Sequence, residues 1–409
     1  MAALEVVCIK RLPKNNKIWY TATEKVEPYD KTVFGATYQS NEWNSATGEG
    51  VITFDNEVTT IGDWAFFGCS SLTSVTIPDV VTTIGYLAFG SCSSLTSVTI
   101  PDVVTAVGRA AFMACYSLQE FSGKFASDDG RCLVIEGVLN SFAPAGITGY
   151  TIHDSVTSIG DAAFEYCSSL ISVTIPDSVT TIGEDAFYDC ENLTSVTIGD
   201  SVTSIGDSAF ENCSSLISVT IPDSVTGIGN RAFQWCTSLT SVTIGDSVTT
   251  IGEDAFYECS SLRSITIPDS VTTIEAHTFH GCSNLTSVTI GDGITAIGGL
   301  AFCGCSNLTS VSIGDSVTTI GHSAFWVCSS LTSVTIPDSV TTIEDRAFDG
   351  CSSLTSIYCK PTTPPTGDSF MFSDNASDRM IYVPMESVSE YKSASYWDDY
   401  ADAIVGYNF

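Results

Sequence analysis

Histidine and cysteine side chains that could bind a metal ion lie close together in one part of the sequence. His277 and His280 form an H-x-x-H pair, and Cys303 follows His280 by 23 residues. Zinc accepts imidazole nitrogens and thiolates, and a structural zinc site uses about four such ligands. No fourth ligand is evident beside these three. We therefore interpret the group as a coincidence on a surface and assign no metal site.

Motifs typical of enzymes are missing from the sequence. No G-x-S-x-G nucleophile motif, P-loop or dinucleotide-binding fingerprint occurs in a strand-to-helix context. Acidic residues are plentiful, but the paired carboxylates of a glycoside hydrolase must flank a cleft. A uniform repeat offers no obvious cleft, so we expect no catalytic residue and no cofactor, and we predict that the chain is not an enzyme.

The charge balance excludes two classes of partner. The 409 residues include Lys+Arg 15 against Asp+Glu 47, which gives a net charge of −32. A nucleic-acid-binding protein needs a basic surface to displace counterions from phosphate, and so does a protein that adsorbs to anionic lipids. Hydrophobic residues make up 44% of the chain, which is too many for global disorder. No apolar stretch is long enough to insert into a membrane.

The first residues leave the route of export open. MAALEVVCIKRLPKNNK places Glu5 within a short apolar stretch and the basic residues after it, whereas a secretory signal has the reverse order. Cys8 follows two valines, but no charged and long apolar segments precede it, so we assign no lipid attachment there. The chain is a mature or trimmed form, an intracellular protein, or one exported by another route.

A repeat of 23 residues accounts for most of the chain. Each of twelve copies carries a cysteine, with a phenylalanine three residues before it and a leucine three residues after it. Successive cysteines are 23 residues apart except between Cys115 and Cys167. The cysteines are Cys69, Cys92, Cys115, Cys167, Cys190, Cys213, Cys236, Cys259, Cys282, Cys305, Cys328 and Cys351.

The copy that begins at Leu193, LTSVTIGDSVTSIGDSAFENCSS, shows how the repeat folds. Residues 195–198 alternate polar and apolar side chains, which predicts a short half-buried strand. Gly199, Asp200 and Ser201 then form a turn. One copy cannot bury its own Leu, Val, Ile and Phe side chains, but stacked copies cover one another. We therefore predict a solenoid.

The pattern L-x-x-V-x-I-P/G-D-S-V-x-x-I-G-x-x-A-F-x-x-C resembles the BspA-like class of leucine-rich repeat. The resemblance implies an α/β repeat protein, a right-handed leucine-rich-repeat solenoid with a parallel β-sheet on its concave face. It places the solenoid at residues 50–357, between an N-terminal cap at 1–49 and a C-terminal cap at 358–409. It also implies a location at the cell surface or outside the cell, and adhesion to host proteins or to other cells.

Two segments depart from the repeat. The irregular repeat at about 118–146 contains RCLVIEGVLNSF, which predicts a β-hairpin that replaces the A-F-x-x-C segment and stands off the solenoid. Beyond the array, we expect a strand around Ile381–Val383 and a helix from about Glu386 to close the far end. Caps are needed because the ends of a stack expose strand edges and apolar surface.

Stacking turns each position of the repeat into a column of side chains. Cysteines that point inward in parallel would hold their Cβ atoms too far apart for disulfides, so we expect buried thiols. Four cysteines lie outside this column, and whether they are thiols or disulfides stays open: Cys8, Cys132, Cys303 and Cys359. The aspartates of the P/G-D-S turns form a second column, from Asp79 to Asp338. We expect them to accept backbone N–H groups two residues on, with Ca²⁺ bridging as an alternative.

The positions just before the cysteine vary most between copies and carry aromatic residues that packing does not require. Exposed aromatic side chains among acidic groups are typical anchors of an interface. Drift on an unconstrained surface is the alternative. The candidate partner-binding residues are Tyr188, Trp235, Tyr257 and Trp326.

These observations favour a non-enzymatic surface or secreted protein that presents an extended solenoid surface to a host or microbial surface protein or glycan. The alternatives are a structural spacer or assembly component and a phage-encoded host-recognition protein. The partner, its affinity, the face that binds it and the oligomeric state cannot be inferred from the residues.

Overall fold

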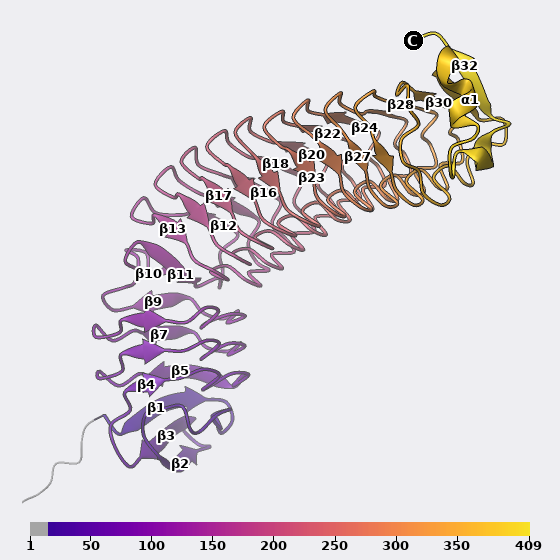
Figure 1. Cartoon of the computed structure of the whole chain (residues 1–409). Coiled ribbons are helices and arrows are strands. Elements are labelled where there is room, and N and C mark those ends of the chain that lie inside the picture. The colour runs from indigo at the N-terminus through magenta and orange to yellow at the C-terminus, as the bar shows by residue number, and fades with distance from the viewer. Residues whose placement is uncertain (1–14) are drawn as a thin grey trace, which may run out of the picture. The chain divides into compact units, whose positions relative to one another are not determined.

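The computed structural model describes residues 15–409, so Cys8 lies outside the described residues. The chain divides into two compact units. The first consists of the residues up to Gly146 together with 160–164, and the second of 147–159 together with 165–409. Each is a stack of coils in which short strands recur with the period of the sequence repeat (Figure 1).

The second unit contains parallel strands that pair in register, one repeat apart. Val173 pairs with Val196, and Ile265 pairs with Val288. The longer strands are β12 (Gly149–Thr151), β14 (Ser172–Thr174), β16 (Ser195–Thr197), β18 (Ser218–Thr220), β20 (Ser241–Thr243), β22 (Ser264–Ile267), β24 (Ser287–Ile290), β26 (Ser310–Ser312), β28 (Ser333–Ile336), β30 (Ser356–Cys359), β31 (Met380–Pro384) and β32 (Ile404–Tyr407).

A second ladder of two-residue strands runs beside the first, because each repeat contains a second apolar segment after the P/G-D-S turn. Ile205 pairs with Ile228 and Ile297 pairs with Ile320. The strands are β13 (Ser158–Ile159), β15 (Thr181–Ile182), β17 (Ser204–Ile205), β19 (Gly227–Ile228), β21 (Thr250–Ile251), β23 (Thr273–Ile274), β25 (Ala296–Ile297), β27 (Thr319–Ile320) and β29 (Thr342–Ile343).

The first unit begins with antiparallel strands, which cover the edge of the first parallel coil. Strand β1 (Lys17–Ala22) pairs antiparallel with both β3 (Glu49–Phe54) and β5 (Leu72–Thr76). The remaining strands of the first unit are β2 (Tyr38–Asn44), β4 (Thr60–Ile61), β6 (Thr83–Ile84), β7 (Ser97–Thr99), β8 (Ala106–Val107), β9 (Glu120–Ser122), β10 (Cys132–Ile135) and β11 (Val138–Phe142).

Phenylalanine rings from successive coils stack to form the centre of the second unit. From Phe187 to Phe348 the neighbouring ring centroids are 5.0–5.5 Å apart and the planes lie within 8° of each other. Stacked rings of this kind stabilise the core beyond the area that they bury. The solenoid with parallel strands that the sequence predicts is therefore confirmed.

The term α/β is wrong for this chain, because almost no helix is present among residues 15–409. The structure there contains the four-residue helix α1 (Val388–Tyr391) and the 3₁₀ turns η1 (Met385–Ser387) and η2 (Asp398–Tyr400). The A-F-x-x-C segment forms tight turns. The residue before its alanine and the residue before its cysteine, such as Asp185 and Asp189, adopt left-handed backbone angles that end any helix. None of the helices described here has the length and apolarity that a bilayer span requires.

The hairpin of the irregular repeat is present, but it does not stand off its unit. Strands β10 and β11 pair antiparallel, and the Leu133 and Leu139 side chains are fully buried. Leu133 belongs to the hydrophobic core that also contains Phe121. Because its apolar side chains replace those of the missing A-F-x-x-C segment, the hairpin lies against the core.

Aromatic side chains end the stack at the C-terminus. Phe372 stacks on Phe348 with ring centroids 5.6 Å apart. Tyr400 then meets Phe372 edge-on at 5.6 Å, and Trp397 lies tilted against it at 5.9 Å. These rings cover the face of Phe372 that a further coil would otherwise cover, and Trp397 is fully buried.

Candidate functional site

The backbone near each cysteine is held in a conformation that suits glycine. The residue directly before the cysteine has a positive φ, with glycine in some coils (71° at Gly281 and 73° at Gly304). Other coils place side chains there, with φ of 58° at Trp235 and 59° at Val327. Left-handed angles cost an L-residue about 1–2 kcal/mol, and a β-branched residue is the least tolerant of them. Trp235 and Val327 are therefore not explained by backbone preference.

Trp235 and Trp326 are exposed, as the sequence analysis expects. Their exposed fractions are 42% and 40%, and Val327 beside Trp326 is 41% exposed. Their main chains take part in the links between coils, with Trp235 N–H donating to the Tyr257 carbonyl and the Trp326 carbonyl accepting from Gly304 N–H. Neither packing nor main-chain pairing thus requires an indole at these positions.

Tyr188 and Tyr257 are half-buried and engage neighbouring rings. Tyr188 lies edge-on to Tyr166 with centroids 5.7 Å apart, and Tyr257 stacks on His280 at 4.8 Å. Burial raises the pKa of Tyr188 to about 12, and the Glu211 carboxylate contributes to the rise. Burial likewise raises the pKa of Tyr257. Both tyrosines therefore carry neutral hydroxyl groups at physiological pH.

The four candidate residues follow one edge of the second unit and do not converge on a pocket. Tyr188, Tyr257 and Trp326 share one position of the repeat, at intervals of three coils, and Trp235 occupies the neighbouring position. At about 4.8 Å per coil the row extends roughly 30 Å. We call Tyr188, Trp235, Tyr257 and Trp326 with Val327 the aromatic edge. Val327 was missed because a lone valine carries no interface signal in a sequence.

A denser group of aromatic residues, none of them among the four predicted partner-binding residues, lies in the first unit. The Trp64 ring lies 4.7 Å from Phe67, 5.4 Å from Tyr86 and 6.3 Å from Tyr29. Tyr29 is 69% exposed and Tyr86 is 41% exposed. Phe67, Trp64 and Tyr86 occupy variable positions of the repeat, but Tyr29 comes from the N-terminal segment. No periodicity could have predicted its contribution.

Three members of the aspartate column, Asp177, Asp223 and Asp269, have a different role from the one expected. Asp177 accepts the Asp200 N–H at 2.9 Å, and Asp223 accepts the Asp246 N–H at 3.0 Å, so these carboxylates bind the next coil and not a group two residues on. Gly199 permits this close approach, because a Cβ there would lie 2.6 Å from the Pro176 carbonyl. A groove of about 750 Å³ lies along these turns.

The cysteines of the column donate hydrogen bonds between coils. Cys236 Sγ–H donates to the Phe210 carbonyl at 3.2 Å, and the same bond recurs from Cys259 to Phe233 at 3.1 Å. Burial raises the pKa of these thiols, so they stay protonated. The prediction of buried thiols is confirmed for both. Cys303 and Cys359 are also buried thiols, and Cys132 is buried in β10.

The repeat region matches the model of a known protein family. The family model described as "BspA type Leucine rich repeat region" matches residues 45–126, 139–263 and 249–377, which make up well over half of the chain. The chain belongs to this family. No curated protein sequence matches it.

Solved structures of bacterial leucine-rich repeat proteins resemble this BspA-type chain. A protein from Bacteroides ovatus is 26% identical, with a TM-score of 0.55, over 86% of this chain and 88% of that one. A leucine rich cell surface protein from Faecalibacterium prausnitzii is 29% identical, with a TM-score of 0.48, over 92% and 98%. The leucine-rich repeat protein of T. pallidum is 30% identical, with a TM-score of 0.40, over 46% and 90%.

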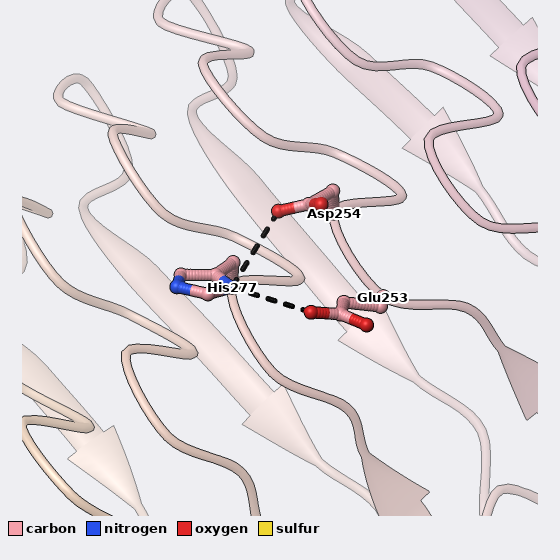
Figure 2. Close-up of side chains that lie close together, drawn as sticks. All are labelled: Glu253, Asp254 and His277. Carbon is pink, nitrogen blue, oxygen red and sulfur yellow. Dashed lines mark ion pairs between the residues drawn. The ribbon is translucent and has the colours of Figure 1, made fainter.

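Among residues 15–409 of the BspA-type chain, the side chains grouped most closely for metal binding are Glu253, Asp254 and His277 (Figure 2). Their ligand atoms lie within 4.8 Å of one another. His280 and Cys303, which the sequence places next to His277, are not members of this group. No residue of the aspartate column belongs to it either, and Ca²⁺ binding by that column stays a prediction.

Proposed function

We propose that the chain is a non-enzymatic binding protein of the bacterial surface, or a secreted one, and that its aromatic edge contacts a protein or glycan partner. Leucine-rich repeat proteins generally bind proteins, and members of the BspA-like class are typically displayed or secreted. The observation that carries the proposal is Trp235, an indole that is 42% exposed at a backbone position where other coils use glycine. Because most coils place a side chain at this left-handed position, the exposed indole, and not the backbone angle, distinguishes Trp235 from its counterparts.

The chemistry of the edge suits a protein or a glycan. Indole and phenol rings are rigid and bury a large area with little loss of rotamer entropy, which makes them frequent interface anchors. They also present flat apolar faces on which sugar rings can lie. A row of about 30 Å is long enough for a standard interface, which buries about 800 Å² on each partner.

A binding screen with matched variants tests the proposal. The purified chain is applied to a glycan array and to immobilised host and microbial surface proteins, beside Trp235→Ser/Trp326→Ser. Trp19→Ser is the control, because Trp19 is a tryptophan of the first unit that is even more exposed, at 53%. We expect the double variant to lose at least about tenfold in affinity while keeping its circular dichroism spectrum, and the control to bind normally.

Two results would contradict the proposal. Equal binding by the double variant and the wild type would show that the aromatic edge is not the contact surface. Lack of binding by the wild type across the whole screen would argue against a binding role and in favour of a structural spacer.

A further inference from the structure

Three side chains from two successive coils point toward one another on the surface of the second unit (Figure 2). His277 Nδ1 lies 3.6 Å from Asp254 Oδ1 and 3.7 Å from Glu253 Oε1. Asp254 and His277 hold the same position in adjacent coils, and both have left-handed backbone angles, with φ of 57° and 56°. The solenoid itself therefore brings the imidazole next to the carboxylates.

The distances are too long for hydrogen bonds. An N–H···O bond spans about 2.7–3.2 Å, so neither carboxylate accepts a hydrogen bond from His277 Nδ1. That nitrogen is nevertheless shielded from solvent and has no hydrogen-bond partner. A buried polar atom without a partner costs about 1–3 kcal/mol of folding free energy. An ion bound by His277 Nδ1 would remove this cost.

The two distances from His277 Nδ1 are close to those between ligands that share one metal ion, and all three ligand atoms lie within 4.8 Å of one another, so small side-chain rotations would complete the site. Zinc binds imidazole nitrogen and carboxylate oxygen at about 2.0–2.2 Å, so two of its tetrahedral ligands lie about 3.3–3.6 Å apart. One nitrogen and two oxygens favour zinc or a related transition ion over calcium, which takes oxygen ligands. We propose that Glu253, Asp254 and His277 bind one divalent transition-metal ion of the zinc class.

The charges around the group agree with a cation site. A metal ion binds an imidazole in its neutral form, so the two carboxylates would supply the negative charge of the site. Arg231 Nε lies 3.5 Å from Asp254 Oδ2 and offsets part of that charge. The arginine approaches the oxygen that faces away from His277, so it orients the carboxylate while Oδ1 stays available to the ion. Partners of this kind commonly fix the ligands of metal sites.

The internal repeat provides a comparison that isolates the histidine. Glu184 and Asp185 occupy the same positions as Glu253 and Asp254 in an earlier coil, but Ser208 stands where His277 would be. The acidic pair alone thus recurs in the array, and His277 distinguishes the proposed site from it. With three protein ligands, the fourth position of a tetrahedral ion is left to water or to a group of a partner.

Calorimetric titration with Zn²⁺ alone tests the site, using the untagged, chelator-treated full chain with its thiols kept reduced. We expect one equivalent to bind, and His277→Gln to weaken binding at least about 100-fold. Asp254→Asn should also weaken Zn²⁺ binding, because it removes the negative charge of the ligand. The variant should keep the fold, because asparagine tolerates the left-handed backbone angle at this position. The matched control is His322→Gln, which removes a histidine from another coil and should leave the affinity unchanged.

Titration with Co²⁺ identifies the donor atoms. Nitrogen and oxygen ligands give weak visible bands, whereas thiolate ligands add an intense near-ultraviolet charge-transfer band. Visible bands that disappear in His277→Gln would support the proposal. Equal Zn²⁺ binding by the wild type and His277→Gln, no binding by the wild type, or a thiolate band would overturn it.

Discussion

The side-chain amide of Asn375 donates a 2.8 Å hydrogen bond to the carbonyl oxygen of Phe348. Elsewhere in the array the corresponding phenylalanine carbonyls accept from cysteine thiols, as Phe325 does from Cys351 at 3.2 Å. Phe372, three residues before Asn375, continues the ring stack. The last coil therefore keeps the inter-coil bond of the repeat with a different donor.

Replacing Asn375 by alanine should destabilise the C-terminal end of the array. The Phe348 carbonyl would keep only the longer hydrogen bond from Cys351 N–H at 3.4 Å, so the loss of the Asn375 amide should cost about 0.5–1.5 kcal/mol. Asn375→Cys should recover part of the loss, because a thiol is the donor in the regular coils. Urea unfolding followed by circular dichroism measures both variants. A cysteine variant no more stable than the alanine variant would argue against the equivalence of the two donors.

Within the array, Cys236→Ala should be more damaging than Cys359→Ala. Both side chains are fully buried, so both changes leave a similar small cavity. Cys236 also donates to Phe210, whereas Cys359 makes no such bond in the described part of the chain. The difference in the free energy of unfolding should be about 1 kcal/mol. Equal losses would mean that the thiol bonds contribute little.

Glycine should be better tolerated than alanine at Val327 and worse tolerated at Tyr257. Val327 has a φ of 59°, and a glycine there avoids the cost of about 1–2 kcal/mol that a side chain imposes. Tyr257 has no such angle, so a glycine there should be about 0.5–1 kcal/mol less stable than an alanine. Thermal unfolding of the four variants checks the prediction, and the same order at both sites would refute it.

Glu211→Gln should stabilise the protein at neutral pH and do less so in acid. Burial raises the pKa of Glu211, so the folded state binds this proton more tightly than the unfolded chain does. Protonated Glu211 therefore stabilises the folded state below the ordinary pKa of glutamate. This contribution is lost as the pH rises through the raised pKa of Glu211 in the folded protein. Glutamine is already found at the next copy of this position, where Gln234 is equally buried.

Chemical unfolding of Glu211→Gln at several pH values from roughly 4 to 7 measures this effect. The gain over the wild type should shrink as the pH falls. Glu191→Gln, at an exposed position, should change stability by less than about 0.5 kcal/mol throughout. A gain for Glu211→Gln that is independent of pH would contradict the burial of a charged carboxylate.

The regular part of the fold could be predicted because its cause repeats. The spacing of Phe and Cys fixes which side chains face inward, and the stacked rings from Phe187 to Phe348 follow from it. Asn375 was not predictable in the same way, because the last coil is one residue longer and its donor is an amide. The buried hairpin residue Leu133 was also missed, since hairpin patterning does not show which face is covered.

The candidate site was predicted less completely than the fold. The variable columns identified Trp235 and Trp326, because repeats show directly where packing does not select the residue. They could not distinguish exposed Trp326 from half-buried Tyr257, which stacks on His280. The sequence pairs His277 with its near neighbour His280, whereas the structure brings it to Glu253 and Asp254, since neighbouring coils contact each other at equivalent positions.

The account rests on an interior that adjacent coils share, and native-state alkylation measures this directly. The folded chain is treated with iodoacetamide and each cysteine is then mapped by mass spectrometry. We predict that Cys213, Cys236 and Cys259 stay unmodified until denaturant is added, because all three are fully buried and burial raises their thiol pKa. Rapid modification of these thiols in the native protein would contradict it.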